Sequence, residues 1–238
     1  MNENKNVLII GHRGANSIAP ENTLKAFKKA IELKADFIEF DIRLSKDNET
    51  VIMHDDNTFR TTGHDGQITN MTVKELKSLD CGEGEQIPTL HEVIELTNSK
   101  IGLQIEVCAP GMAEKLVSIL RENDLIESSI VSSFQYSELL NIQKLEPNLK
   151  LGLLISANVE SNKFVMKFTQ KAIKKEFYSI HPYYEFIDEN YVNYVHNNNL
   201  KVIAYTVNNK SDIENLIKMG VNGIITDDIL ITKLALNS

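Results

Sequence analysis

Short runs of β-branched and apolar residues recur along the chain, and segments with helical spacing separate them. The runs predict buried strands at 7–10, 36–42, 101–107, 129–133, 150–155, 177–180, 201–207 and 223–226. Apolar residues at spacings of three and four predict amphipathic helices at 22–34, 89–98, 112–123, 136–146, 188–198 and 211–220. The chain therefore alternates between strand and helix.

This alternation predicts the α/β class and, within it, a (β/α)8 TIM barrel. Eight strand–helix units in about 250 residues are typical of that barrel, whereas an open doubly wound sheet has fewer strands and a glycine-rich first turn. The second and third strands are separated by a longer segment, at about 45–88, with an extended piece, a turn-rich loop and a helix. Thr72 and Glu75 form a capping box for that helix. We interpret the segment as a small inserted cap.

The composition excludes several classes of protein. The 238 residues are 42% hydrophobic and 24% charged, and no linker, charge block or low-complexity segment divides them, so we expect one domain over 1–238. The net charge of −8 argues against nucleic acid as a partner. The N-terminal apolar run is too short for a signal peptide, and no stretch of about 18 apolar residues exists. We therefore expect a cytoplasmic protein without stable membrane insertion.

Polar residues follow the first predicted strand at the end where a parallel barrel has its active site. The strand runs directly into Gly11-His12-Arg13-Gly14, which makes His12 and Arg13 candidate functional residues. Asn22 and Thr23 open the first helix, and we interpret them as capping residues.

Three carboxylates belong to the next two strands. Glu39 and Asp41 are spaced by two and so share one strand face, and Glu106 ends the third strand. Because parallel strands are covered on both faces, these carboxylates need partners, and a cation is the natural one. Oxygen ligands suit a hard divalent cation, Mg²⁺ or Ca²⁺, and the residue types do not separate the two.

His54 follows the extended residues 51–53 of the insertion. Imidazole titrates near neutral pH, so His12 and His54 beside a cation are candidates for general acid and base. We interpret the other four histidines as structural or surface residues: His64, His91, His181 and His196.

Further motifs extend from the first strand to the last. They are HRGANSIAPENTLKAF at 12–27, IEFDIRLSKDNETVIMHDD at 38–56, RTTGHDG at 60–66, IPTL at 87–90, SSF at 132–134, YTVNN at 205–209 and GIITDD at 223–228. Together they closely resemble the glycerophosphodiester phosphodiesterase family. Each motif alone is weak, but HRG, PENT, ExD and HD in this order and spacing are highly specific.

The resemblance implies a (β/α)8 barrel that hydrolyses a small-molecule glycerophosphodiester to sn-glycerol 3-phosphate and an alcohol, with one divalent cation. By position it implies that His12 and His54 form the catalytic pair and that Arg13, with His12, contacts the phosphate. It also implies the cation ligands Glu39, Asp41 and Glu106. The segment at about 45–88 resembles the family's small cap.

Two positions depart from the family pattern. The third strand carries Glu106-Val107-Cys108 where the family usually has Glu-x-Lys, so a lysine that helps to hold the phosphate is missing. Position 108 shares its strand face with Glu106, and we expect weaker phosphate binding, a lysine from another strand, an altered substrate, or a Cys108 that merely fills space. Tyr205 replaces the usual tryptophan, and we expect Cys108, Phe134 and Tyr205 to line the substrate pocket.

Two other functions stay open at this point. One is a lysophospholipase D or sphingomyelinase-D-like activity on lipid head groups, against which stands the lack of a membrane-binding segment. The other is a non-catalytic barrel that binds phosphodiesters but has lost turnover with the lysine. The nucleophile is either water or the neighbouring 2-hydroxyl of glycerol. The sequence does not identify the alcohol or the oligomeric state.

Overall fold

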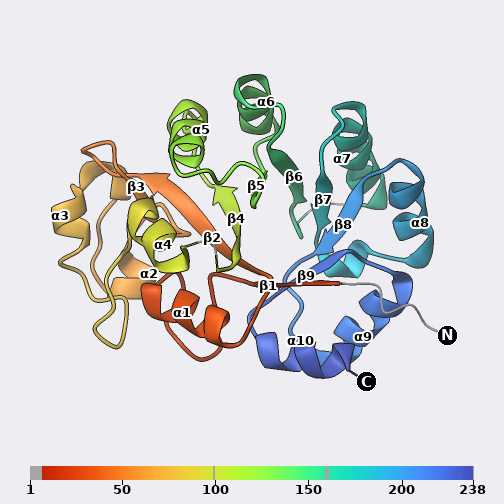
Figure 1. Cartoon of the computed structure of the whole chain (residues 1–238), viewed down its shortest axis with the longest axis horizontal. Helices are drawn as coiled ribbons and strands as arrows, with labels where there is room; N and C mark the ends of the chain where they lie inside the picture. Colours follow the sequence, from red (N-terminus) through yellow and green to blue (C-terminus); the bar gives the residue numbers. More distant parts are fainter. Residues whose placement is uncertain (1–6, 99, 159–160, 238) are drawn as a thin grey trace.

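Eight parallel strands form a closed barrel, and helices surround it (Figure 1). The computed structural model describes residues 7–98, 100–158 and 161–237. The barrel strands are β1 (Leu8–Gly11), β2 (Phe37–Leu44), β4 (Gly102–Val107), β5 (Ser129–Ser133), β6 (Lys150–Ile155), β7 (Ser179–Pro182), β8 (Lys201–Ala204) and β9 (Gly223–Thr226). Their order is β1-β9-β8-β7-β6-β5-β4-β2, and pairing of β1 with β2 closes the ring.

Along the chain, each barrel strand is followed by at least one helix before the next barrel strand begins. The helices around the barrel are α1 (Leu24–Glu32), α4 (Leu90–Thr97), α5 (Ala113–Glu122), α6 (Tyr136–Leu145), α7 (Asn162–Lys174), α8 (Glu189–Asn197), α9 (Lys210–Met219) and α10 (Ile229–Leu236). The predicted (β/α)8 barrel is thus confirmed. The six predicted helices lie within two residues of their predicted bounds, and α7 and α10 are the two that the pattern did not predict.

The alternation of side chains along β2 separates the hydrophobic core from the barrel mouth. Phe40 points outward, and its ring centroid lies 5.6 Å from that of Phe27 on α1. Glu39 and Asp41 point the other way, into the barrel. The parallel register of β2 and β4 pairs Asp41 with Glu106, so carboxylates from two strands lie at one level.

The segment at about 45–88 folds over one side of the barrel. It contains β3 (Thr50–Ile52), which is antiparallel to β2, and three short helices, α2 (Phe59–Thr62), η1 (Ile68–Asn70) and α3 (Val73–Leu76). The predicted capping box of Thr72 and Glu75 begins α3. A small core of its own holds the cap together: Val51, Met53, Ile68, Leu76 and Ile87.

The barrel interior below the mouth is filled by side chains rather than by solvent. Strand β7 begins two residues later than predicted. Ser179 and His181 are two residues apart on it, so they share the buried inner face, with Ser179 Oγ 2.8 Å from His181 Nε2. Gly152 makes room for this imidazole, because a Cβ there would lie 2.4 Å from His181 Nε2. Burial lowers the pKa of His181 to about 3, so the ring is neutral. This fits its interpretation as a structural residue.

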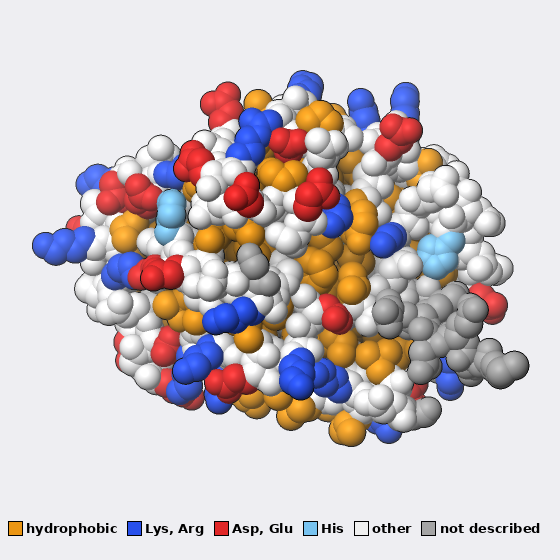
Figure 2. All heavy atoms as spheres, in the orientation of Figure 1, with side chains coloured by type: hydrophobic (Ala, Val, Ile, Leu, Met, Phe, Trp, Pro, Cys, Tyr) orange, Lys and Arg blue, Asp and Glu red, His pale blue; other side chains and the backbone are white. Residues whose placement is uncertain are grey.

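The outer surface carries charges of both signs. Figure 2 shows acidic and basic side chains interspersed on one face, with hydrophobic side chains between them. The mixture agrees with the 25 basic and 33 acidic residues of the chain. Among the described residues, no helix has both the length and the apolar character that crossing a bilayer needs.

Candidate active site

The loop after β1 brings His12 and Arg13 to the barrel mouth. Arg13 has a left-handed backbone with φ 53°, and Gly14 follows with φ 88° at a point where a Cβ would lie 2.7 Å from Ala26. This tight turn aims the Arg13 backbone N–H at Glu39, whose Oε2 accepts it at 2.9 Å. Burial alone would lower the pKa of Arg13, but Asp41 and the neighbouring glutamates raise it, so the guanidinium stays charged.

His12 is held by Asp227, the residue directly after β9. His12 Nδ1 lies 2.6 Å from Asp227 Oδ1, and Asn16 Nδ2 donates to the same oxygen at 2.7 Å. Burial opposes ionisation of Asp227, but the hydrogen bonds from His12 and its neighbours lower its pKa overall. Anchoring Nδ1 leaves Nε2 as the nitrogen for proton transfer. Sequence analysis missed Asp227, although its position at a strand end is the signal that would have found it.

His54, in the loop after β3, has a matching arrangement. His54 Nδ1 lies 2.6 Å from Asp55 Oδ1, and the His54 carbonyl oxygen accepts from Arg43 Nε at 2.9 Å. The side chain of His54 is 42% exposed against 20% for His12, so both imidazoles are accessible from solvent. The structure therefore gives each predicted catalytic histidine one carboxylate partner at Nδ1.

A chain of ion pairs connects the two histidine loops through cap helix α2. Arg13 Nη1 and Arg60 Nη2 each lie 2.7 Å from Glu21 Oε1, and Arg60 Nε lies 2.6 Å from Asp55 Oδ2. Burial raises the pKa of Glu21, but hydrogen bonds from Arg60 and Arg13 lower it to about 2. The pKa of Asp55 falls to about 2 for the same reasons, with Arg60 and His54 as donors.

Asp41, Glu106 and Cys108 meet at the mouth. One oxygen or sulfur atom from each lies within 4.8 Å of the others. Cys108 Sγ is 3.4 Å from Asp41 Oδ1 and 3.5 Å from Glu106 Oε1, and burial followed by these two carboxylates raises the pKa of the thiol. A protonated thiol has one hydrogen, so it donates to only one carboxylate at a time. Glu39, the third predicted ligand, lies deeper on the same strand face and is outside this tight group.

Asn22 is not the helix cap that the sequence predicted. Thr23 caps α1, because its Oγ1 accepts from the Ala26 backbone N–H at 3.2 Å. Asn22 has a left-handed backbone with φ 56°, and its buried Nδ2 donates to Asp41 Oδ2 at 2.8 Å. The turned backbone thus removes Asn22 from the helix end and assigns it to the acidic cluster.

The acidic cluster fits a hard divalent cation. Burial and then the neighbouring carboxylate of Asp41 raise the pKa of Glu106 to about 8, and the pKa of Glu39 is raised for the same reasons. Carboxylates buried together need protons or a cation to offset their repulsion. Asn22 Oδ1 is buried beside them without a hydrogen-bond partner in the described part of the chain. The set of oxygen atoms therefore suits a divalent cation better than a soft metal, and the thiol of Cys108 is the one soft group in it.

A cavity of about 210 Å³ opens beside these carboxylates. Its walls include Arg43, His54, Glu106, Cys108, Phe134 and Gln135. The ring of Phe134, which is 43% exposed, meets the ring of Tyr205 edge-on at a centroid distance of 6.1 Å. The Tyr205 hydroxyl donates to the Ile155 carbonyl oxygen at 2.7 Å and so keeps this ring in place. Cys108 and Phe134 lie on the wall of this cavity. Tyr205, which the sequence also assigned to the substrate pocket, is not among the residues that line it and contacts the Phe134 ring instead.

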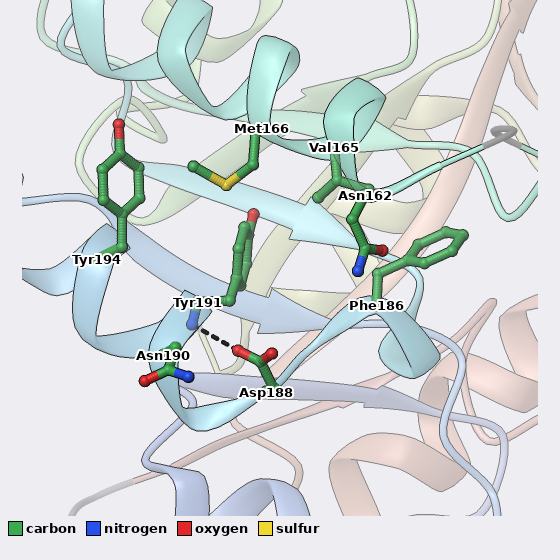
Figure 3. A pocket seen from close by; sticks show the side chains of 8 residues that line it. All are labelled: Asn162, Val165, Met166, Phe186, Asp188, Asn190, Tyr191 and Tyr194. Atoms are coloured by element: carbon green, nitrogen blue, oxygen red, sulfur yellow. Dashed lines mark hydrogen bonds between the residues drawn. The ribbon is translucent and has the colours of Figure 1, made fainter.

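A second, larger cavity of about 320 Å³ lies between α7 and α8 (Figure 3). It contains none of the predicted site residues, and its walls are mainly aromatic and aliphatic. The candidate residues His54, Glu106, Cys108 and Phe134 line the smaller cavity instead.

The barrel, with two anchored histidines and a cluster of carboxylates at its mouth, has the arrangement of a hydrolase-type TIM barrel. The chain belongs to the Glycerophosphoryl diester phosphodiesterase family, whose sequence model matches residues 12–231. The family resemblance predicted from the motifs is confirmed.

Relatives and solved structures agree with this assignment. A glycerophosphodiester phosphodiesterase of Caldanaerobacter subterraneus subsp. tengcongensis is 40% identical over 93% of this chain and 94% of its own. The structure of an Oleispira antarctica phosphodiesterase, in complex with the product sn-glycerol-3-phosphate, matches with a TM-score of 0.86 at 30% identity over 97% of both chains. A glycerophosphodiester phosphodiesterase from Thermotoga maritima matches with a TM-score of 0.80 at 31% identity, over 96% of this chain and 98% of its own.

Proposed function

We propose that this glycerophosphodiester phosphodiesterase is metal-dependent and uses His12 and His54 as general acid and base to release sn-glycerol 3-phosphate and an alcohol. One observation carries the proposal: two imidazoles at the mouth each have Nδ1 2.6 Å from a carboxylate, His12 from Asp227 and His54 from Asp55. Family membership and the product bound to the Oleispira antarctica relative support the reaction.

In this proposal Glu39, Asp41 and Glu106 hold one divalent cation, Mg²⁺ or Ca²⁺. Glu39 and Asp41 are buried, and the pKa values of Glu39 and Glu106 are raised by burial and by neighbouring carboxylates. These observations support the assignment, because a cation relieves the repulsion between the carboxylates. Lewis-acid stabilisation of charge on a phosphoryl oxygen is the chemistry that a cation bound there supplies.

The residues of the chain itself handle the phosphate and the protons. Arg13, held at Nη1 by Glu21, contacts the phosphate together with His12. One imidazole takes the proton of the nucleophile at Nε2, and the other gives a proton to the leaving alkoxide, each transfer contributing about 10²- to 10⁴-fold. Asp227 and Asp55 hold the rings in one orientation and stabilise the imidazolium that forms.

The cavity walls of Cys108 and Phe134, with Tyr205 behind, enclose the organic part of the substrate. An aromatic wall beside a charged centre is the usual composition of a small-molecule site, with the apolar surface giving contact area and the polar groups giving orientation.

The test is release of sn-glycerol 3-phosphate from glycerophosphocholine in the presence of Mg²⁺, Ca²⁺ or EDTA. We expect turnover with at least one cation and none in EDTA. Equal turnover in EDTA would contradict the cation site, and cation-dependent binding of glycerophosphocholine without turnover would favour the non-catalytic barrel.

A further inference from the structure

Arg43 differs from the other arginines of the chain in having no carboxylate partner. The chain has four arginines, and three of them form ion pairs with a carboxylate: Arg13, Arg60 and Arg121. Arg43 forms no ion pair with any of the described residues. A guanidinium keeps its positive charge at every physiological pH. The charge of Arg43 is therefore not held by a neighbouring side chain.

The register of β2 and β4 brings Arg43 to the mouth cavity. Ile42 on β2 lies opposite Val107 on β4, and the Cys108 backbone N–H donates to the Ile42 carbonyl oxygen at 3.3 Å. Arg43 shares its strand face with Asp41, so its side chain leaves β2 on the side of the cation ligands. Arg43 and Cys108 both line the cavity of about 210 Å³. The unpaired charge thus lies at the catalytic cavity, beside position 108.

Only part of the Arg43 guanidinium is used within the protein. Nε and Nη2 both donate to the His54 carbonyl oxygen, at 2.9 and 2.5 Å. Nη1 has no hydrogen-bond partner in the described part of the chain, and the side chain is half-buried. A guanidinium carries five N–H donors, two of them on Nη1. The contact with His54 therefore holds the group in place and leaves the donors of Nη1 for a ligand.

We propose that Arg43 binds a phosphate oxygen of the substrate through Nη1. The inference rests on the proposed function, because that function places the phosphate in the mouth cavity. There the carboxylates of Asp41 and Glu106 face the cation, so the phosphate is the anion left for Arg43. A guanidinium donates to phosphate oxygens through charge-assisted hydrogen bonds, and one that is already held on its other side loses little freedom on binding. Arg43 is thus a second phosphate contact beside Arg13.

The binding test measures the affinity of sn-glycerol 3-phosphate by calorimetry, in saturating Mg²⁺ and separately in saturating Ca²⁺. Arg43→Gln keeps an N–H donor for the His54 carbonyl oxygen but removes the charge, so we expect affinity to fall about 10- to 150-fold. Arg43→Lys keeps the charge and should retain most of the affinity. Arg121→Gln is the matched control, because Arg121 also donates to a backbone carbonyl oxygen, that of Leu145, and does not line the cavity. It should bind as the unmodified protein does.

Kinetics on glycerophosphocholine separate phosphate binding from a role in holding the His54 loop alone. Phosphate binding predicts that Arg43→Gln raises KM and weakens product binding together, and that Arg43→Lys largely restores both. If Arg43 only held His54, Arg43→Gln would lower kcat and leave the affinity for sn-glycerol 3-phosphate unchanged. That result would overturn the proposal, and so would equal losses of affinity in Arg43→Gln and Arg121→Gln.

A crystal structure of the unmodified protein with a cation and sn-glycerol 3-phosphate keeps the test valid if the Arg43 variants fail to fold. We expect Nη1 of Arg43 within hydrogen-bond distance of a phosphate oxygen. A bound phosphate that Arg43 does not contact would overturn the proposal.

The neighbouring position offers a rescue experiment. Because position 108 lies beside position 43, Cys108→Lys in the Arg43→Gln protein should recover at least about tenfold in affinity, as one charge-assisted hydrogen bond would give. Cys108→Met in the same protein is the uncharged control and should recover nothing. Equal affinities in these two double variants, at unchanged cation affinity, would count against a phosphate beside positions 43 and 108.

These binding measurements do not depend on turnover. Failure of the unmodified protein to hydrolyse glycerophosphocholine would count against the proposed function alone. Normal turnover, together with unchanged product affinity in Arg43→Gln, would count against this inference alone.

Discussion

Arg60 and Glu21, which lie 39 positions apart, are joined by two hydrogen bonds of 2.7 Å, from Arg60 Nη1 to Glu21 Oε2 and from Nη2 to Oε1. This bidentate contact fixes both the distance and the relative angle of the guanidinium and the carboxylate. Arg60 comes from the cap and Glu21 from the loop that precedes α1, so the contact sets the cap against the barrel mouth. Arg60 also holds Asp55, the partner of His54. The pair therefore aligns the two sides of the site.

Replacing Arg60 with methionine should reduce activity more than stability. Arg60 is 46% exposed, and exposed ion pairs contribute about 1 kcal/mol or less to the free energy of unfolding. Loss of the alignment of Asp55 and Glu21 should lower kcat by about tenfold or more, because small displacements at a catalytic site are costly. Steady-state kinetics on glycerophosphocholine and thermal unfolding measure the two effects.

The control for Arg60→Met is Lys25→Met. Lys25 on α1 pairs with Glu83 in the cap, so this substitution also breaks a contact between cap and barrel, but one that holds no histidine partner. Near-normal kcat is expected for Lys25→Met. If Arg60→Met and Lys25→Met lowered kcat equally, general loosening of the cap and not alignment of Asp55 would be the cause.

His12→Ala and His54→Ala should each lower kcat by at least about 100-fold, the contribution of one proton transfer. Both residues lie in loops after strand ends, and truncation there creates little cavity in the core, so thermal unfolding should change little. His91→Ala, at an exposed position on α4, is the control and should keep full activity. Near-normal turnover in either mouth variant would show that the acid and base have been wrongly assigned.

The cation-free protein should lose stability as the pH rises from about 6.5 to 8. Burial raises the pKa of Glu106 to about 8, above the 4.5 of an unfolded glutamate, so the folded state keeps a proton that the unfolded state has lost. Stability then falls with rising pH, by roughly 1 kcal/mol per pH unit for one proton. His181 does not add to this slope. Burial lowers its pKa in the folded state from 6.5 to about 3, so its effect on the free energy of unfolding is complete by about pH 6.5.

Thermal unfolding in EDTA across that pH range measures this effect. Added Mg²⁺ or Ca²⁺ should remove the slope, since a bound cation stabilises the ionised carboxylates. Glu106→Gln should make the slope in EDTA shallower, with Glu39 as the remaining buried carboxylate of raised pKa, whereas Glu114→Gln, at an exposed position on α5, should leave the slope unchanged. A slope that persists unchanged in Glu106→Gln would exclude Glu106 as its source.

The barrel could be predicted because buried parallel strands appear in the sequence as runs of apolar residues. The helices α7 and α10 could not be predicted from the hydrophobic pattern. In α7 the buried stripe is Val165, Thr169 and Ala172, so a threonine and an alanine occupy positions where a hydrophobic pattern expects large apolar residues. In α10, which follows β9 almost directly, nearly every residue is apolar. A segment that is hydrophobic all round has no periodicity to separate it from the preceding strand.

The positions of the candidate site residues could be predicted where they lie at strand ends, but not where they depend on contacts across the fold. Glu39, Asp41 and Glu106 follow from strand spacing and parallel register. The pairing of Arg60 with Glu21 joins residues with no periodic relation, and the role of Asn22 depends on its left-handed backbone. Tertiary contacts and a turned backbone leave no signal in a hydrophobic pattern.

The last prediction concerns Cys108→Lys, at the position where the family usually has lysine. Cys108 lies on the cavity wall, so a longer side chain can extend past the carboxylates toward a bound phosphate. At saturating cation we expect kcat/KM for glycerophosphocholine to rise by about 10- to 150-fold, the effect of one charge-assisted hydrogen bond. Cys108→Met, of similar length but uncharged, is the control and should show no such gain.

The sign of the change identifies what the ammonium group contacts. Because Cys108 Sγ lies 3.4 Å from Asp41 Oδ1 and 3.5 Å from Glu106 Oε1, a lysine that turns back would pair with those carboxylates and compete with the cation. Activity would then fall, and the cation concentration needed for half-maximal activity would rise. Unchanged kcat/KM at matched cation saturation would show that the side chain at 108 does not reach the phosphate, and the missing lysine would then have no consequence for catalysis in this protein.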